Sequence, residues 1–225
     1  MMAQIKKLQR EKLKAILVDM DGTLADGMGL LFQTYLKFLN RYGYEGTEEE
    51  FKKIVGPAIP EVLATLKLKY DIPKSVPDLL EEYHQILREI YISKVPLFPG
   101  ALEFIQYINQ TSLKLVMVTS ADREFAMEFL RSHQIESYFD SVITPEGLAY
   151  SKPASDIYER ALEQLQITPD EAVAIEDSPN GILAALGADI YTIQIRHQNS
   201  AQIFHHEHCL PITGWYDVLK YFQEG

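Results

Sequence analysis

Two aspartates, Asp19 and Asp21, stand two positions apart directly after the apolar segment Ala15–Val18. At the carboxyl end of a buried strand, two carboxylates would repel each other and lose hydration unless a cation or a shared proton relieved them. Mg²⁺ meets this need, because it binds oxygen ligands and keeps several waters while it bridges to a substrate phosphate. The pair therefore predicts a magnesium site for phosphoryl transfer. The alternative is an ordinary turn after a strand, where Asp and Gly are common.

A second pair of acids, Glu176 and Asp177, follows another apolar segment, Ala172–Ile175. Acids at the ends of two strands of one parallel sheet can converge on one ion, because ligand sites in such sheets lie outside the carboxyl ends of the strands. The alternative is helix capping, in which Asp177 or Ser178 accepts hydrogen bonds from the first N–H groups of a following helix.

Two further features could bind a phosphoryl group. Thr119 and Ser120 follow the segment Leu115–Val118, so they would place a hydroxyl and a free backbone N–H at a third strand end. Lys152 precedes a predicted helix, where its charge could neutralise a carboxylate and a phosphate together. Each signal is weak alone, because a lysine is usually a solvated surface residue.

Apolar segments alternate with helical patterns through the part of the chain that carries these residues. The segments are almost continuously apolar, which is typical of strands covered on both faces in a parallel sheet. The alternation predicts an α/β fold with a doubly wound parallel sheet. The expected strands are Ala15–Met20, Leu115–Thr119, Ala172–Ile175 and Ile190–Ile195, with a short one near Ser141–Thr144; the expected helices are Ala101–Gln110, Arg123–Ser132 and Ser155–Gln166.

The stretch between the first strand and Pro96 shows helical periodicity and no strand pattern. Within it, a run of apolar residues recurs at the spacing of one helical face, at Leu79, Leu80, Tyr83, Ile86, Leu87 and Ile90. Glycines and prolines divide the stretch into roughly four helices. The sequence therefore predicts an α/β core domain of residues 1–26 and 96–225 and an inserted helical domain of residues 27–95.

Four segments, DMDGT, VMVTS, SKPASD and AIEDSPNGI, resemble in this order the haloacid dehalogenase superfamily. The resemblance spans nearly the whole chain, and the DxDGT and EDS pieces are specific. It implies a Rossmann-like core and a small helical cap, as in the branch that holds phosphoglycolate phosphatases and β-phosphoglucomutases. Such a cap closes over the site, with hinges expected near Ala25–Gly29 and Val95–Pro99.

The resemblance also implies a role for each site residue. Asp19 is expected to be the nucleophile that forms an aspartyl-phosphate, and Asp21 the acid and base. Thr119, Ser120 and Lys152 are expected to bind the phosphoryl group, with Thr119 and Lys152 also steadying the nucleophile. The expected Mg²⁺ ligands are Asp19, the backbone carbonyl of Asp21 and Asp177, with Glu176 supporting through a bound water.

These roles predict a magnesium-dependent phosphatase that hydrolyses a small phosphorylated metabolite. The alternative in the same family is a sugar phosphomutase of the β-phosphoglucomutase type, which carries a histidine on the first cap helix and an arginine deeper in the cap. Here the first histidine is His84, and the cap arginines are Arg41 and Arg88. Dehalogenases need no acid at the position of Asp21. A catalytically inactive binding module is the alternative from another class, and the intact set of acids and Lys152 disfavours it.

Composition and charge exclude further classes of partner and location. The net charge of −11 disfavours broad nucleic-acid binding, which needs clustered Lys and Arg. No apolar run approaches the roughly 20 residues of a membrane span, and the N-terminus has no secretory pattern, so a cytoplasmic location is expected. The expected oligomeric state is a monomer or a weak dimer. Two C-terminal groups have no predicted role in the site: the potential ligands His205, His206, His208 and Cys209, and the aromatic residues Trp215, Tyr216, Tyr221 and Phe222, which are expected to form a packed helix.

Overall fold

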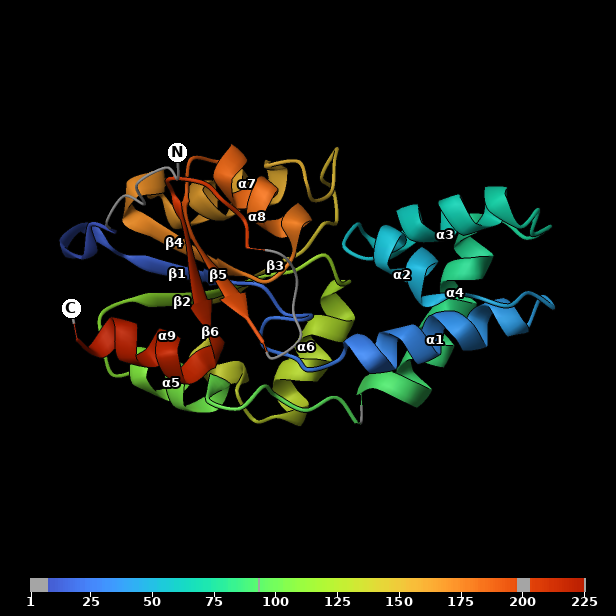
Figure 1. Cartoon of the computed structure of the whole chain (residues 1–225), viewed down its shortest axis with the longest axis horizontal. Coiled ribbons are helices and arrows are strands. Elements are labelled where there is room, and N and C mark those ends of the chain that lie inside the picture. The colour runs from blue at the N-terminus through green and yellow to red at the C-terminus, as the bar shows by residue number, and fades with distance from the viewer. Residues whose placement is uncertain (1–7, 93, 198–202, 225) are drawn as a thin grey trace.

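The computed structural model describes residues 8–92, 94–197 and 203–224. Within them, six parallel strands form one sheet in the order β3-β2-β1-β4-β5-β6 (Figure 1). The chain crosses the sheet from β1 outward in both directions, which confirms the predicted doubly wound topology. The strands are β1 (Ala15–Val18), β2 (Lys114–Val118), β3 (Ser141–Ile143), β4 (Ala172–Glu176), β5 (Tyr191–Arg196) and β6 (Cys209–Thr213).

Both faces of the sheet are buried, which explains why the strands read as continuous apolar runs. In β1, Ile16 and Val18 belong to one core, whereas Ala15 and Leu17 belong to the other. Helices α7 (Asp156–Leu165) and α8 (Pro179–Gly187) cover the second of these faces. The first is covered by α5 (Ala101–Ile108), α6 (Arg123–Ser132) and α9 (Gly214–Gln223).

The sheet contains a strand that the sequence patterns did not predict. β6 pairs in parallel with β5, with Cys209 opposite Thr192, and forms an edge of the sheet. Pro211 interrupts its apolar pattern, and an edge strand tolerates proline because one side of its backbone needs no partner. Cys209 is buried at its start, and the ring of His206 accepts a hydrogen bond from the backbone N–H of His208. These residues therefore belong to the connection into β6.

The C-terminal aromatic residues form α9, as predicted. Trp215 and Phe222 are buried against Phe104 of α5, whereas Tyr216 is largely exposed. The indole N–H of Trp215 donates to the backbone oxygen of Thr23 at 2.9 Å. The last helix thus packs on the sheet and also reaches the loop that follows β1.

Four α-helices separate β1 from α5 in the sequence, and Figure 1 shows them lying together to one side of the sheet. Two of them begin at capping side chains: Thr47 accepts from the N–H of Glu50, and Ser75 accepts from the N–H of Asp78. The four helices are α1 (Met28–Asn40), α2 (Glu48–Ile54), α3 (Ile59–Lys69) and α4 (Val76–Leu87), and a π-helix, Arg88–Ile92, follows. We call residues 27–95 the helical segment.

The two connections to the helical segment run side by side. The N–H of Asp26 donates to the oxygen of Pro96 at 2.9 Å, and Ala25 forms an antiparallel bridge with Leu97. The predicted boundaries at 26/27 and 95/96 therefore lie where the two connecting segments pair with each other. That the helical segment acts as a separate domain stays a prediction.

Short 3₁₀ helices complete the described structure, at Arg10–Lys12, Glu136–Tyr138 and Pro169–Glu171. None of the helices in the described ranges is long and apolar enough to cross a membrane.

Candidate active site

The loop after β1 holds both aspartates of the first motif. Asp19 is buried, and its N–H continues the sheet by donating to the oxygen of Ile175. Asp21 is half-buried and faces a cavity. Gly22 has a φ of +85°, and a Cβ at this position would lie 2.3 Å from Oδ2 of Asp177. Only glycine therefore lets the turn approach the second motif so closely.

Three carboxylates from two strand ends meet in this loop region. One ligand atom each of Asp19, Glu176 and Asp177 lies within 4.8 Å of the others, and this is the group of potential metal ligands found in the described residues. Burial and the neighbouring Asp19 raise the pKa of Glu176 to about 7, against the opposing effect of Lys152. Burial, with Asp19 and Glu176, also raises the pKa of Asp177 well above its ordinary value. Burial is the largest cause of both shifts, and the neighbouring carboxylates add to it because like charges disfavour ionisation.

Lys152 is 3% exposed and joins the two motifs, so it does not occupy the surface position usual for a lysine. Its Nζ donates to Oδ1 of Asp19 at 2.7 Å, to Oε1 of Glu176 at 2.6 Å and to the oxygen of Val118 at 3.0 Å. Burial alone would lower the pKa of Lys152, but the two carboxylates raise it above its ordinary value. The lysine is therefore charged and fixed by three acceptors.

Two side chains that the sequence patterns did not single out also hold the acids. The hydroxyl of Tyr158, on α7, donates to Oε1 of Glu176 at 2.6 Å, and the hydroxyl of Thr23 donates to Oδ1 of Asp177 at 3.2 Å. Thr23 lies inside the first motif and could have been found there. Tyr158 reads as one more apolar position of a helix, so its role has no signal in the sequence.

One buried carboxylate oxygen of the cluster needs a further partner, which a metal ion could supply. Oε1 of Glu176 accepts from both Lys152 and Tyr158, whereas Oε2 is buried with no hydrogen-bond partner among the described residues. A buried acceptor of this kind is costly unless a water or an ion satisfies it. The donor set is all oxygen, which suits Mg²⁺ better than a transition metal.

The ends of β2 and β4 also place hydroxyls nearby. Thr119 is buried and lines the cavity with Ser120. The N–H of Thr119 donates to Ile143, so the amide expected to be available for a phosphoryl oxygen is not that of Thr119. Ser178 also lines the cavity, and its hydroxyl accepts from the N–H of Gly181. The capping alternative is thus correct for Ser178, and not for Asp177.

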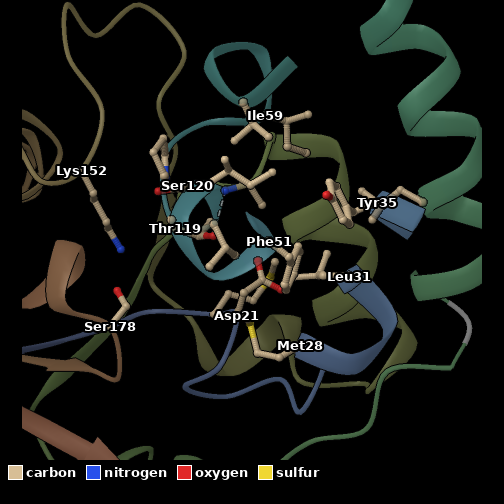
Figure 2. Close-up of a pocket in the computed structure, with 18 of the residues that line it drawn as sticks. Asp21, Met28, Leu31, Tyr35, Phe51, Ile59, Thr119, Ser120, Lys152 and Ser178 are labelled. Atoms are coloured by element: carbon tan, nitrogen blue, oxygen red, sulfur yellow. Dashed lines mark hydrogen bonds between the residues drawn. The ribbon is translucent and has the colours of Figure 1, made fainter. Parts of the chain in front are cut away.

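The cavity lies between these strand ends and the helical segment. Figure 2 shows Lys152 and Ser178 on one side, Leu31 and Tyr35 on the opposite side, and Asp21 and Thr119 between them. The cavity is lined by all of the predicted site residues except the fully buried Glu176: Asp19, Asp21, Thr119, Ser120, Lys152 and Asp177. The arrangement places acids, an ammonium and hydroxyls around one cavity.

Comparison with known proteins agrees with this geometry. The model of the family described as haloacid dehalogenase-like hydrolase matches residues 16–195. A phosphorylated carbohydrates phosphatase of Thermotoga maritima is 30% identical over 181 residues, which cover 80% of this chain and 84% of that protein.

Two solved structures share the architecture. One, from Thermotoga maritima and proposed to be a β-phosphoglucomutase, has a TM-score of 0.72 and 26% identity, covering 94% of this chain and 99% of that one. CbbY of Rhodobacter sphaeroides, in complex with phosphate, has a TM-score of 0.77 and 24% identity, covering 89% and 93% of the two chains. The second likeness concerns the fold alone.

Proposed function

The chain belongs to the haloacid dehalogenase-like hydrolases and is an enzyme of the phosphatase kind, and from this premise we propose that it is a Mg²⁺-dependent phosphatase of a small phosphorylated metabolite. The observation that carries the proposal is the buried contact between Lys152 and Asp19, both of which line the cavity. It supports a nucleophilic role for Asp19, because the lysine fixes one carboxylate oxygen and leaves the other for attack.

The proposed reaction has two displacements. In the first, a carboxylate oxygen of Asp19 attacks phosphorus, the bond between phosphorus and the ester oxygen breaks, and Asp21 gives its proton to the departing alkoxide. In the second, Asp21 takes a proton from water, the water attacks phosphorus, and Asp19 is released with inorganic phosphate. Lys152 holds Asp19 and offsets the charge of the phosphoryl group. Thr119 and Ser120 would bind phosphoryl oxygens.

The metal would be held by Asp19, Asp177 and the backbone carbonyl of Asp21, with Glu176 beside them. When bound, Mg²⁺ would supply positive charge that lets an anionic nucleophile approach an anionic phosphate. The protein itself supplies little positive charge here. In the described structure Lys152 is the cation that contacts the three acids, through Asp19 and Glu176.

Activity is expected to require Mg²⁺ and to stop in excess EDTA, and Ca²⁺ should inhibit because its larger and more irregular shell suits the reaction poorly. Mg²⁺ should also raise the midpoint of thermal unfolding, because the three acids converge in the native state and not in the unfolded chain. The measurements are phosphate release and a thermal melt, each with and without the ion. In Asp177→Asn the rise should be much smaller than in the wild type. Full turnover in EDTA would refute the metal assignment.

Asp21→Asn is expected to lower kcat by on the order of 10²–10⁴-fold, because an amide can neither give nor take the proton. Asp26→Asn is a matched control: it lies in the same loop, is exposed, and should keep the wild-type rate. Steady-state phosphate release from a panel of monoesters measures both. An unchanged rate in Asp21→Asn would assign the acid to another residue.

The described lining of the cavity favours hydrolysis over the phosphomutase reaction, because the helical segment contributes no basic side chain to it. A mutase must hold a second phosphate, yet the described lining residues from α1 to α4 include no Lys, Arg or His. Nε2 of His84 instead lies 2.6 Å from Oδ2 of Asp122, and Nη2 of Arg88 lies 2.7 Å from Oε1 of Glu124. Both acids lie at the start of α6. Incubation with β-glucose 1-phosphate, Mg²⁺ and a trace of the bisphosphate separates the two reactions. Glucose 6-phosphate forming much faster than free phosphate would favour the mutase.

A further inference from the structure

We propose that the preferred substrates are phosphate monoesters of apolar alcohols or phenols rather than sugar phosphates. The inference rests on the proposed phosphatase function and concerns the group that leaves with the ester oxygen. It departs from the substrate in the printed name of the Thermotoga relative, a phosphorylated carbohydrates phosphatase.

The wall of the cavity opposite the acids is apolar. Four side chains of the helical segment line it and are only partly buried, so they present hydrocarbon surface to whatever enters: Met28 and Leu31 on α1, and Ile59 and Val62 on α3. Phe51 and Leu66 close the wall behind them. Figure 2 draws Met28, Leu31 and Phe51 around Asp21, and all four residues line the same cavity. In the proposed mechanism Asp21 protonates the leaving group, so this apolar surface is the one that the leaving group would meet.

Side-chain polar groups on this wall are few, and the hydroxyl of Tyr35 is already engaged. The described lining residues from α1 to α4 include no acid, no base and no amide side chain. Tyr35 contributes a hydroxyl, but it donates to Glu50 at 2.7 Å and accepts from the N–H of Thr47 at 3.2 Å. Tyr83 is the second tyrosine, and it is buried. Sugar hydroxyls held against this wall would lose water without gaining equivalent hydrogen bonds.

The ammonium and the two hydroxyls expected to bind phosphate are also engaged. Lys152 is bound to Asp19 and Glu176, and in the proposed mechanism the hydroxyls of Thr119 and Ser120 bind phosphoryl oxygens. An apolar leaving group gains from the same surface, because it buries hydrocarbon against hydrocarbon. The binding energy of that remote group can then lower the barrier for the attack on phosphorus.

Cyclohexylmethyl phosphate and glucose 6-phosphate make a matched test. Both are esters of a primary alcohol on a six-membered ring, so their intrinsic reactivity is similar and the ring hydroxyls are the main difference. We expect kcat/KM to be about 10- to 100-fold higher for cyclohexylmethyl phosphate, the range by which a pocket discriminates through such groups. Equal values, or a preference for glucose 6-phosphate, would overturn the inference.

Phenyl phosphate in the same assay separates this inference from the proposed function. Phosphate release from phenyl phosphate together with a preference for the sugar ester would reject the apolar substrate class and keep the phosphatase. No Mg²⁺-dependent release from any of the three esters would reject the phosphatase, and the inference with it.

Two variants locate the preference. Leu31→Asn, which puts an amide on the wall, should lower the ratio of the two kcat/KM values at least several-fold. Leu68→Asn is the matched control, because Leu68 lies on α3 with 83% of its surface exposed and does not line the cavity; its ratio should equal that of the wild type. If Leu31→Asn does not fold, the near-isosteric Val62→Thr takes its place. An unchanged ratio in a folded wall variant would contradict the assignment.

Discussion

Asp19→Asn is expected to abolish turnover and to prevent any phosphoryl group from becoming attached to the protein. The substitution keeps the shape of the side chain but removes the nucleophilic oxygen and the charge that Lys152 contacts at 2.7 Å. Loss of a nucleophile lowers rates by on the order of 10⁴–10⁶-fold, because the remaining groups have nothing to activate. Rapid quench with labelled substrate measures both the rate and the phosphoenzyme.

Folding should survive this change, because the substitution removes one negative charge from a cluster of three carboxylates that repel one another. Asp71→Asn provides the control: Asp71 is exposed in a turn with a φ of 46°, which Asn tolerates as well as Asp, so rate and label should match the wild type. Label that remains on Asp19→Asn protein would show that another residue is the nucleophile.

Lys152→Met is expected to damage both catalysis and stability. The lysine contacts Asp19 and Glu176 in the interior, so methionine would fill a similar volume while leaving two buried carboxylates without their cation. Breaking a buried ion pair by removing one partner typically costs about 3–5 kcal/mol of unfolding free energy. Urea unfolding in EDTA measures this loss, and phosphate release with Mg²⁺ should fall by at least about 10²-fold because Asp19 is no longer held.

A second substitution separates the two effects. Adding Glu176→Gln to Lys152→Met removes one of the unpaired charges, so it should recover part of the lost stability without restoring activity. Lys53→Met, at an exposed i,i+4 pair with Glu49, should change stability by less than about 1 kcal/mol. Wild-type stability in Lys152→Met would show that the buried contacts contribute little.

The order of elements and the positions of the acids followed from local patterns in the sequence. A strand buried on both faces reads as a short apolar run, and the polar residue that ends the run must lie at the edge of the sheet. This reasoning placed Asp19, Thr119 and Glu176 at strand ends although the predicted strand bounds differ from the observed ones by one or two residues. Parallel strands bring their carboxyl ends to one end of the sheet, so the sequence indicated that these residues could converge. That they do converge depends on β1 lying between β2 and β4, which the sequence patterns did not predict.

Edge strands and capping residues were harder to assign from the sequence. β6 escaped prediction because Pro211 breaks its pattern and its pairing depends on β5, not on its own residues. Ser178 fits a ligand and a helix cap equally well in sequence, and the observed bond from Gly181 decides for the cap.

Contacts between residues far apart in the chain were decided by the tertiary structure alone. Lys152 is 133 residues from Asp19 and 24 from Glu176, and no local pattern tells whether such a lysine is solvated or buried between two acids. The bond from Tyr158 to Glu176 depends on the packing of α7 against the sheet. The apolar wall arises in the same way, because side chains from α1, α2 and α3 that read in sequence as ordinary helix cores meet around one cavity only after these helices have packed.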